Sequence, residues 1–377
     1  MMSGSIADLI ASRRLLVFVG EGGVGKTSTA AAAALAAAAA GRDVAVLTVD
    51  PAPRLGDALG LGSFDEQPRR VEVCDRLPGG GSVVAMRLDT KRTFDRVVQR
   101  FAPGADGADA ILDNPIYQTI SGSLGGSESY MAFQRLHELT EEGDHDLLVV
   151  DTPPAVHAAE LLSAPLRLDT LLDTRLVSIL ANPAQVVARA GSTVARATTA
   201  ILVSVLERLT GAELHQQISA FVENFEHVLT GLSQQTRAIE SLLRAPGTAF
   251  VEVVRPRPAC VEAAVALERS LAQSRIAIEA VVVNRMTPPP GPDRTRSRRQ
   301  RLEGAPTGTE AAVTRMEGDL DGLRAAEAGA VAMLRAGFAR RPAHEQPAVV
   351  EVASLDHDVT SLDDVLRLGR CLQGATG

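Results

Sequence analysis

The eight residues Gly20–Thr27, Gly-Glu-Gly-Gly-Val-Gly-Lys-Thr, constrain the fold of this chain more than any other feature. They match the phosphate-binding loop G-x-x-x-x-G-K-[ST] at every fixed position. An apolar run, Leu15–Val19, precedes the loop, and an alanine-rich segment, Ser28–Ala40, follows it. This order predicts a strand, a loop and a helix, in which the glycines let backbone N–H groups turn toward a triphosphate. The sequence therefore predicts a nucleotide-binding α/β domain.

Two side chains of this loop carry the chemistry of the motif. Lys26 is expected to neutralise the β- and γ-phosphates of ATP, and the Thr27 hydroxyl is expected to bind Mg²⁺. The alternative is a glycine-rich turn that binds nothing, which the complete match in the right setting disfavours. ATP and Mg²⁺ are thus the expected cofactors. The expected nucleotide-binding residues of this segment are Gly20, Glu21, Gly22, Gly23, Val24, Gly25, Lys26, Thr27 and Ser28.

Composition favours a large domain that works in a reducing compartment. Hydrophobic residues make up 45% of the 377 residues but aromatics only 3%, so the core must be aliphatic. Three cysteines far apart in sequence, without a C-x-x-C pair, indicate neither a zinc site nor a disulfide framework. A formal net charge of −8 argues against nucleic-acid binding. Because neither a signal peptide nor an apolar stretch of about 20 residues is visible, we expect a cytoplasmic protein without stable membrane insertion.

Strands and helices alternate in the order that predicts a mostly parallel sheet flanked by helices. The predicted strands are nearly continuous Val, Leu and Ile runs, as expected of strands buried on both faces. They are Leu15–Val19, Val44–Val49, Val83–Leu88, Leu147–Val150, Ala249–Val254, Ala280–Val283 and Ala348–Val352. We expect a P-loop NTPase fold in which residues 1–377 form a single ATPase domain.

Two long segments with helical patterns, 91–142 and 164–245, interrupt this alternation and predict a helical subdomain inserted between sheet strands. In the second segment apolar residues recur at spacings of three and four, which indicates amphipathic helices. They include Leu214, Ile218, Phe221, Phe225, Val228 and Leu232. The stripes either pack against the sheet and one another or offer an apolar groove to a client.

A further segment, 288–320, is expected to be a mobile loop. It opens with the proline-rich run Pro288–Pro292 and continues with five arginines between Arg294 and Arg301. Prolines break regular structure, and a run of like charges is more typical of a solvated segment than of an anion site.

Acidic residues follow two of the predicted strands, where a nucleotide site needs them. Asp151 ends the run Leu147–Val150, as the Walker B acid near Mg²⁺ and its waters does, and opens a turn placed to sense the γ-phosphate. Asp50 ends the second strand, where a carboxylate can orient or deprotonate the attacking water. An Asp that only initiates the turn is the alternative at Asp50. The expected catalytic residues are therefore Asp50 and Lys26.

These motifs together resemble the ArsA-type family, which covers arsenite-pump ATPases and targeting ATPases for tail-anchored membrane proteins. The resemblance rests on the G-x-G-G-V-G-K-[ST] loop, on Asp-Pro-Ala beginning at Asp50 and on Asp-Thr-Pro-Pro beginning at Asp151. It covers nearly the whole chain, including Val281–Asn284, which is similar to the strand end that recognises adenine in the family. The family belongs to the deviant-Walker class with MinD and ParA.

The resemblance implies roles for residues outside the loop. Asp50 and Asp57 would lie on switch I, although Pro53 stands where the family usually has a histidine, and residues 151–157 would form switch II. Asn284 would read the adenine edge. The segment Val352–Val359 resembles the loop that closes over the base, with an alanine in place of the usual proline. The expected switch residues are Asp57, Thr152, Pro153 and His157.

One loop position departs from the family pattern. Family members usually carry a lysine where this chain has Glu21, and that lysine reaches across a dimer to the partner's phosphates. A carboxylate about 4 Å from a phosphate, at an effective dielectric constant near 20, replaces about 4 kcal/mol of attraction with similar repulsion. Either the closed dimer differs, or Glu21 faces a basic group of a partner, or turnover is slow.

The resemblance implies an ATP-hydrolysing switch protein, as a homo- or heterodimer, that couples its nucleotide state to a hydrophobic client, a membrane protein or a transporter. Three scattered cysteines supply no obvious arsenite site, since arsenite requires clustered thiolates. A nucleotide-dependent binding module that does not hydrolyse ATP is one alternative. A MinD- or ParA-like positioning ATPase is another, although residues 363–377 supply neither a convincing membrane helix nor a basic face.

Overall fold

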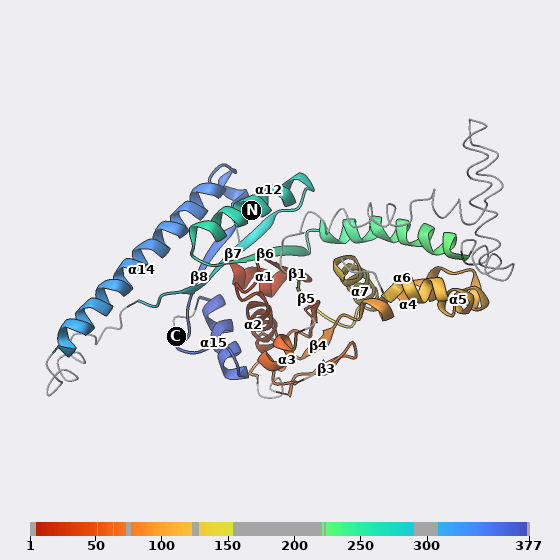
Figure 1. Ribbon diagram of the computed structural model, residues 1–377, viewed down its shortest axis with the longest axis horizontal. Coiled ribbons are helices and arrows are strands. Elements are labelled where there is room, and N and C mark those ends of the chain that lie inside the picture. Colours follow the sequence, from red (N-terminus) through yellow and green to blue (C-terminus); the bar gives the residue numbers. More distant parts are fainter. Residues whose placement is uncertain are drawn as a thin grey trace, which may run out of the picture. The chain divides into compact units, whose positions relative to one another are not determined.

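In the described part of the chain, eight strands form one sheet in the order β3-β4-β2-β5-β1-β6-β7-β8 (Figure 1). Neighbouring strands are parallel except at the edge, where β3 runs antiparallel to β4. Their bounds are β1 Leu15–Val19, β2 Val44–Thr48, β3 Arg69–Arg70, β4 Val83–Arg87, β5 Leu147–Asp151, β6 Thr248–Val254, β7 Ile278–Met286 and β8 Ala348–Ala353. The mostly parallel α/β fold is confirmed. The sequence does not predict β3, because two exposed arginines carry no strand pattern.

The computed structural model describes residues 5–50, 52–62, 64–72, 77–122, 128–153, 221, 224–289 and 308–374. Contacts between residues divide the chain into two units. The first unit comprises residues 1–87, 142–159 and 244–377, and therefore contains the whole sheet. The second comprises residues 88–141 and 160–243.

Helices cover both faces of the sheet in the first unit (Figure 1). On one face α1, α2 and α15 share a core with alternate residues of the strands. On the other face α12 contacts β6 and α14, which itself contacts β7. The bounds are α1 Ile6–Ser12, α2 Lys26–Ala39, α3 Arg54–Ala58, α12 Pro258–Gln273, α14 Thr309–Phe338, the 3₁₀ helix η3 Ala343–Glu345 and α15 Leu362–Leu372.

The alanine-rich helix α2 is buried on all sides, which explains its composition. Residues 30–38 are almost without solvent exposure, because the helix lies between the sheet and α15. A Cβ atom added to Gly369 of α15 would lie 3.0 Å from the carbonyl oxygen of Ala32. Only small side chains allow two helices to approach so closely. The predicted aliphatic core is thus built from alanine as much as from valine and leucine.

The second unit is helical in its described part. Its elements are α4 Thr90–Phe101, α5 Gly104–Leu112, α6 Pro115–Gly122, α7 Glu128–Glu142 and the helical residues 224–243. The ring of Phe94 stacks on Tyr117 and meets Phe225 edge-on, with ring centres 5.5 and 6.2 Å apart. Most of the expected helical segment 164–245 lies outside the described residues. The apolar residues that are described, Phe221, Phe225, Val228 and Leu232, are buried and pack inside this unit.

The expected mobile loop over 288–320 is wrong from Thr309 onward. Helix α14 begins there and continues for 30 residues. The prediction rested on the proline-rich run and the five arginines that follow it, which all lie before Gly308. After Gly308 the sequence changes to helix formers such as Glu310 and Ala311. Residues 290–307, which hold the arginine cluster, lie outside the described residues.

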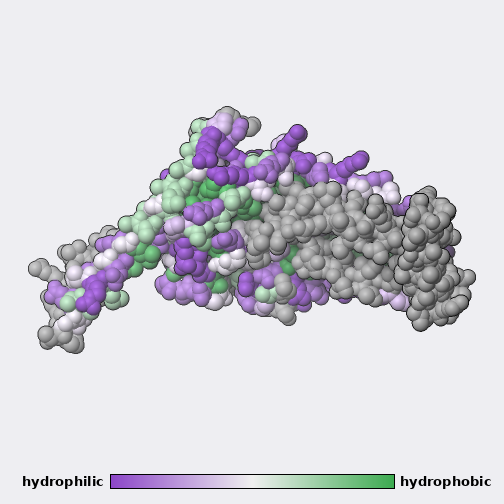
Figure 2. Space-filling view, turned by 45° about the horizontal axis from the view of Figure 1, so that its top comes forward, coloured by the Kyte–Doolittle hydropathy of each residue, from purple (hydrophilic) through white to green (hydrophobic). Residues whose placement is uncertain are grey.

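Helix α14 carries the large hydrophobic side chains that are exposed in the described parts of the chain: Met316, Leu323 and Met333. Hydrophilic residues lie between hydrophobic ones along this helix, which projects at the left of Figure 1 and is seen again in Figure 2. Within the described ranges, no helix combines the length and the hydrophobicity needed to cross a bilayer.

Candidate functional site

The candidate site lies where the central parallel strands end. The phosphate-binding loop follows β1, Asp50 follows β2, and Asp151 is the last residue of β5. Strand β1 pairs with β5 and β5 pairs with β2, so Asp151 is aligned with Phe18 on one side and with Thr48 on the other. Because the carboxyl ends of parallel strands share one edge of the sheet, these residues converge although they are far apart in sequence.

Two glycines of the loop have no room for a side chain. A Cβ atom on Gly20 would lie 2.3 Å from the carbonyl oxygen of Val253, and one on Gly25 would lie 2.2 Å from Nδ2 of Asn284. Gly25 also has a φ of 100°, in the left-handed region that favours glycine. It is the N-cap of α2 and supplies no side-chain cap, so the first N–H groups of the helix stay available to an anion.

Lys26 is buried at the base of the loop. Its Nζ donates hydrogen bonds to the carbonyl oxygens of Gly20, at 2.9 Å, and Glu21, at 2.7 Å. Burial lowers the pKa of Lys26, and the nearby carboxylates of Asp151 and Asp50 oppose that shift. The ammonium is thus held by the loop's own carbonyl groups, from which it can pass to phosphate oxygens.

Asp151 links the loop to two strands. Its Oδ2 accepts hydrogen bonds from the hydroxyl groups of Thr27, at 2.8 Å, and Thr48, at 3.0 Å. Burial raises the pKa of Asp151 to about 6, against the lowering effect of these two bonds and of Lys26. The buried Oδ1 of Asp151 has no hydrogen-bond partner among the described residues. A carboxylate oxygen without a partner, beside a threonine hydroxyl, fits a hydrated Mg²⁺.

A site for Mg²⁺ needs few protein ligands, because phosphate oxygens and water complete its coordination. In the described part of the chain, no group of three His, Cys, Asp or Glu side chains gathers to hold a metal ion. Thr27 and Asp151 therefore fit a cation that arrives together with a nucleotide better than one bound by the protein alone.

Asp50 makes the contact of a turn-initiating residue and also faces the site. Its Oδ1 accepts a hydrogen bond from the backbone N–H of Ala52 at 2.9 Å. Its Oδ2 forms an ion pair with Arg54, one turn along, at 3.3 Å. The two interpretations of Asp50 are therefore compatible, because one oxygen serves the turn and the other is directed to a charged group.

Asn284 locks the loop to the end of β7. Its Nδ2 donates to the carbonyl oxygen of Val24 at 2.9 Å, and its Oδ1 accepts from the backbone N–H of Arg285. Arg285 has a φ of 63°, which is uncommon for a residue with a side chain. Arg285 lies inside β7, where the pairing with β8 shifts register between Val283 and Met286, so Asn284 holds the loop at this irregularity of the strand.

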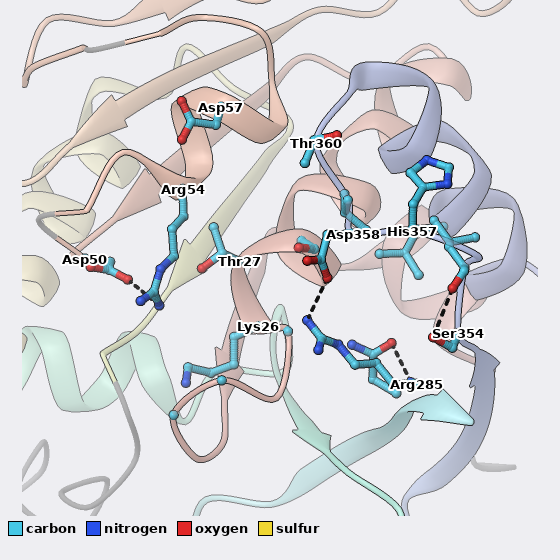
Figure 3. Close-up of a pocket in the computed structure, with 18 of the residues that line it drawn as sticks. Lys26, Thr27, Asp50, Arg54, Asp57, Arg285, Ser354, His357, Asp358 and Thr360 are labelled. Carbon is cyan, nitrogen blue, oxygen red and sulfur yellow. Dashed lines mark hydrogen bonds and ion pairs between the residues drawn. The ribbon is translucent and has the colours of Figure 1, made fainter. Parts of the chain in front are cut away.

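A cavity of about 930 Å³ opens above these residues (Figure 3). The residues expected to bind nucleotide or act as switches that line it are Gly22, Gly23, Gly25, Lys26, Thr27, Ser28, Asp50, Asp57, Thr152 and Asn284. The loop Ala353–Thr360 lines the far end and includes most of the segment expected to close over a base. Gly20, Glu21, Val24, Asp151 and Pro153 do not line the cavity. His157 lies outside the described residues.

The comparison with known proteins agrees with this geometry. Residues 13–305 match the family described as anion-transporting ATPase, the ArsA ATPases. The chain belongs to this family. The resemblance seen in the motifs is therefore confirmed, over a range that includes β1, β2, β5 and β7.

Several relatives of this ArsA-family chain carry the word ATPase in their names. It is 30% identical over 167 residues to the ATPase ASNA1 homolog of Dictyostelium discoideum, covering 44% of this chain and 46% of that protein. It is 26% identical over 189 residues to ATPase asna-1 of Caenorhabditis elegans, covering 47% and 53%. It is also 26% identical over 175 residues to ATPase get3 of Aspergillus terreus, covering 46% and 49%. The chain thus spans about half the length of the curated relatives it matches.

Two cationic residues of this family member were missed by the sequence reasoning. Arg54 and Arg285 both line the cavity (Figure 3). The signal for Arg54 is its place four residues after Asp50, at the start of a helix, where an ion pair between them is geometrically allowed. Arg285 follows directly after Asn284, but its left-handed backbone, and hence its direction, leaves no pattern in the sequence.

Glu21 lies on the side of the loop that faces α12. Its exposed carboxylate lies close enough to Cys260, near the start of that helix, to act on the thiol. Burial raises the pKa of this thiol, and the Glu21 carboxylate raises it further. Within one chain the carboxylate therefore acts on a thiol of α12 and does not line the cavity.

Proposed function

We propose that this chain binds Mg-ATP in the 930 Å³ cavity and hydrolyses it. The observation that carries the proposal is the convergence of Lys26, Thr27, Asp50 and Asp151 at the carboxyl ends of three neighbouring strands. Together they supply a cation, a hydroxyl ligand and two carboxylates, which are the parts that phosphoryl transfer to water requires.

The contacts of each residue support a role for it. Lys26 exchanges two loop carbonyl groups for the β- and γ-phosphates, which hold an ammonium more strongly because they are charged. Thr27 would hold Mg²⁺, and Asp151 would accept hydrogen bonds from the waters bound to it. Mg²⁺ would neutralise charge on the phosphates and on the leaving group. Asp50 orients the attacking water with the oxygen that now faces Arg54.

The far end of the cavity is proposed to hold the base. The loop Ala353–Thr360 lines this end, and Asn284 lines the same cavity beside the phosphate-binding loop. A base bound between them would leave its triphosphate directed at Lys26. The position of Asn284, fixed by its bond to Val24, supports this role, since a group that reads a base must be held in place.

The nucleotide state is proposed to control a hydrophobic or membrane-protein client, with the chain acting in the cytoplasm as a homo- or heterodimer. Membership of the ArsA family supports this role. The order of the chain supports it too, because Thr152 lines the cavity and the second unit resumes at residue 160, soon after it. Asp57, Thr152, Pro153 and His157 are the proposed switch residues between the two.

The experiment that tests the proposal measures binding and hydrolysis separately. Calorimetry should show that the wild type binds Mg-ATP, and a phosphate-release assay should show turnover. Lys26→Ala should lose affinity, because it removes a charge-assisted contact to the phosphates. Equal affinity of the wild type and Lys26→Ala would refute the site. Tight binding without phosphate release, even with a client present, would instead identify a binding module.

A further inference from the structure

We propose that Arg54 is a second phosphate-binding cation of this site, which contacts the γ-phosphate of ATP from within the same chain. It compensates for the lysine that family members usually carry at the position of Glu21. The inference rests on the proposed function, since it names a further residue of the same site. It begins with the position of Arg54, the first residue of α3, directly after the turn that Asp50 initiates.

The Arg54 side chain is free to move onto a ligand. Its side chain is 66% exposed and lines the cavity, and it is paired with Oδ2 of Asp50 at 3.3 Å. Breaking this single contact costs little, because an exposed ion pair contributes little to stability. A charged phosphate oxygen that enters the cavity can therefore displace it.

The direction of the side chain is toward the phosphate end of the cavity. Figure 3 shows Arg54 reaching from α3 between Asp50 and Thr27, on the side of Lys26. The charge of Arg54 is one of the causes that lower the pKa of Lys26, so the two cations lie within electrostatic reach of each other. Two cations brought close together repel each other, and an anion between them removes that repulsion. A phosphate group is the anion that the loop is built to hold.

The charges of the site leave a place for a second cation. A triphosphate carries more negative charge than one Mg²⁺ and one lysine neutralise, and Asp50 adds another negative charge beside it. The other arginine that lines the cavity, Arg285, lies 4.0 Å from Asp358 of the loop at the far end. Arg54 is therefore the arginine placed to serve the phosphates.

The contact would also couple phosphate binding to the freedom of Asp50. With the γ-phosphate present, Arg54 leaves the Asp50 carboxylate, whose Oδ2 is then free to accept a hydrogen bond from the attacking water. After the γ-phosphate departs, the ion pair forms again. Arg54 should consequently favour ATP over ADP, which a residue that only held Asp50 in place would not do.

The test compares the affinities of three variants for Mg-ATP and Mg-ADP by calorimetry. Arg54→Ala removes the cation, and Arg54→Lys keeps a charge. Arg335→Ala is the matched control, because Arg335 is similarly exposed at 58% and paired with Glu351 at 3.0 Å, but does not line the cavity. Thermal melts of all variants show whether each one folds. The exposed position of Arg54 leaves its substitution compatible with folding.

Arg54→Ala should weaken Mg-ATP binding by about tenfold, because one charge-assisted hydrogen bond to the γ-phosphate is lost. Mg-ADP binding should weaken by less than about twofold. Arg54→Lys should restore part of the difference, and Arg335→Ala should change neither affinity. If Arg54→Ala folds and keeps the wild-type ratio of the two affinities, the inference is overturned, even if turnover falls. A wild type that binds neither nucleotide overturns the proposed function itself.

Discussion

The Thr27 hydroxyl donates a hydrogen bond to Oδ2 of Asp151 at 2.8 Å, across 124 residues of sequence. The bond joins the phosphate-binding loop to the end of β5, and Thr48 of β2 donates to the same oxygen. Three elements thus meet on one buried carboxylate. Such preorganisation lowers the cost of assembling a charged site, because the groups already point at one another.

The contact between the loop and β7 gives the first prediction. Gly25→Ala should destabilise the protein more than Gly23→Ala. Both substitutions place alanine at a positive φ, at a cost of about 1 kcal/mol. At Gly25 the new Cβ also meets the Asn284 amide, whereas at Gly23 nothing lies within 4 Å. Moving that amide breaks its bond to Val24, worth about 1 kcal/mol more.

Urea denaturation measures the two losses of stability. The double variant Gly25→Ala with Asn284→Ala serves as the control for the clash, because it removes the group that the new Cβ meets. Its loss should be smaller than the sum of the two single losses. Equal destabilisation by Gly23→Ala and Gly25→Ala would contradict the close approach of Gly25 to Asn284.

Local patterns in the sequence predict which residues gather at the site. They do not predict the directions in which the side chains point. The loop, Asp50 and Asp151 follow apolar runs, and parallel strands bring their ends together, so their convergence is predictable. The contact of Glu21 with Cys260 depends on which way an exposed side chain turns after the loop is folded. The prediction of a loop over 288–320 failed because the prolines at its start have no bearing on the helix that begins 17 residues after Pro292.

Asp50→Asn is expected to keep Mg-ATP binding and to abolish steady-state phosphate release. The amide has the shape of the carboxylate but cannot accept a proton from the attacking water. Its oxygen can still accept the bond from the N–H of Ala52, so the turn is retained. Calorimetry and phosphate release, measured on the same preparation, separate the two effects. An Asn variant that turns over at the wild-type rate would show that Asp50 serves the turn alone.

A buried carboxyl on β6 predicts a pH-dependent loss of stability. Burial raises the pKa of Glu252 well above its ordinary 4.5, and the charges of Glu268 on α12 and of Glu21 on the loop raise it further. Its buried Oε2 has no hydrogen-bond partner in the ranges that the structure describes. The native state therefore holds this proton more tightly than the unfolded chain does. Stability from this group is present below pH 4.5 and is lost as the pH rises through the raised native pKa.

Glu252→Gln should remove this dependence, because the amide keeps the shape and has no charge to bury. The difference in melting temperature between the variant and the wild type should grow in favour of the variant as the pH is raised above 4.5. Glu262→Gln, at an exposed position of α12, controls for the substitution itself. A difference that stays constant from pH 4.5 upward would contradict a protonated, buried Glu252.

The position of Glu21 can be read from the reactivity of Cys260. Burial raises the pKa of the Cys260 thiol most, and the Glu21 carboxylate raises it further. The charges of Arg257 and Arg255 lower it. Glu21→Gln removes the negative charge, and Glu21→Lys replaces it with a positive one. Both should lower the thiol pKa and speed its alkylation at mildly alkaline pH, with the lysine variant faster, because the thiolate is the reactive form.

The rate is measured with iodoacetamide, with Cys260→Ser to identify the signal and Cys371 as an internal reference on α15. A Glu21 that instead faced the phosphates would leave the Cys260 rate unchanged in both variants and would change nucleotide affinity. The lysine variant also tests the proposed dimer. If Glu21 stays beside Cys260, Glu21→Lys brings a third cation to Arg255 and Arg257, and repulsion among them should weaken any partner contact that carries basic groups there. Sedimentation with a non-hydrolysable ATP analogue measures this, and tighter association of the lysine variant would show that its charge reaches the partner's phosphates.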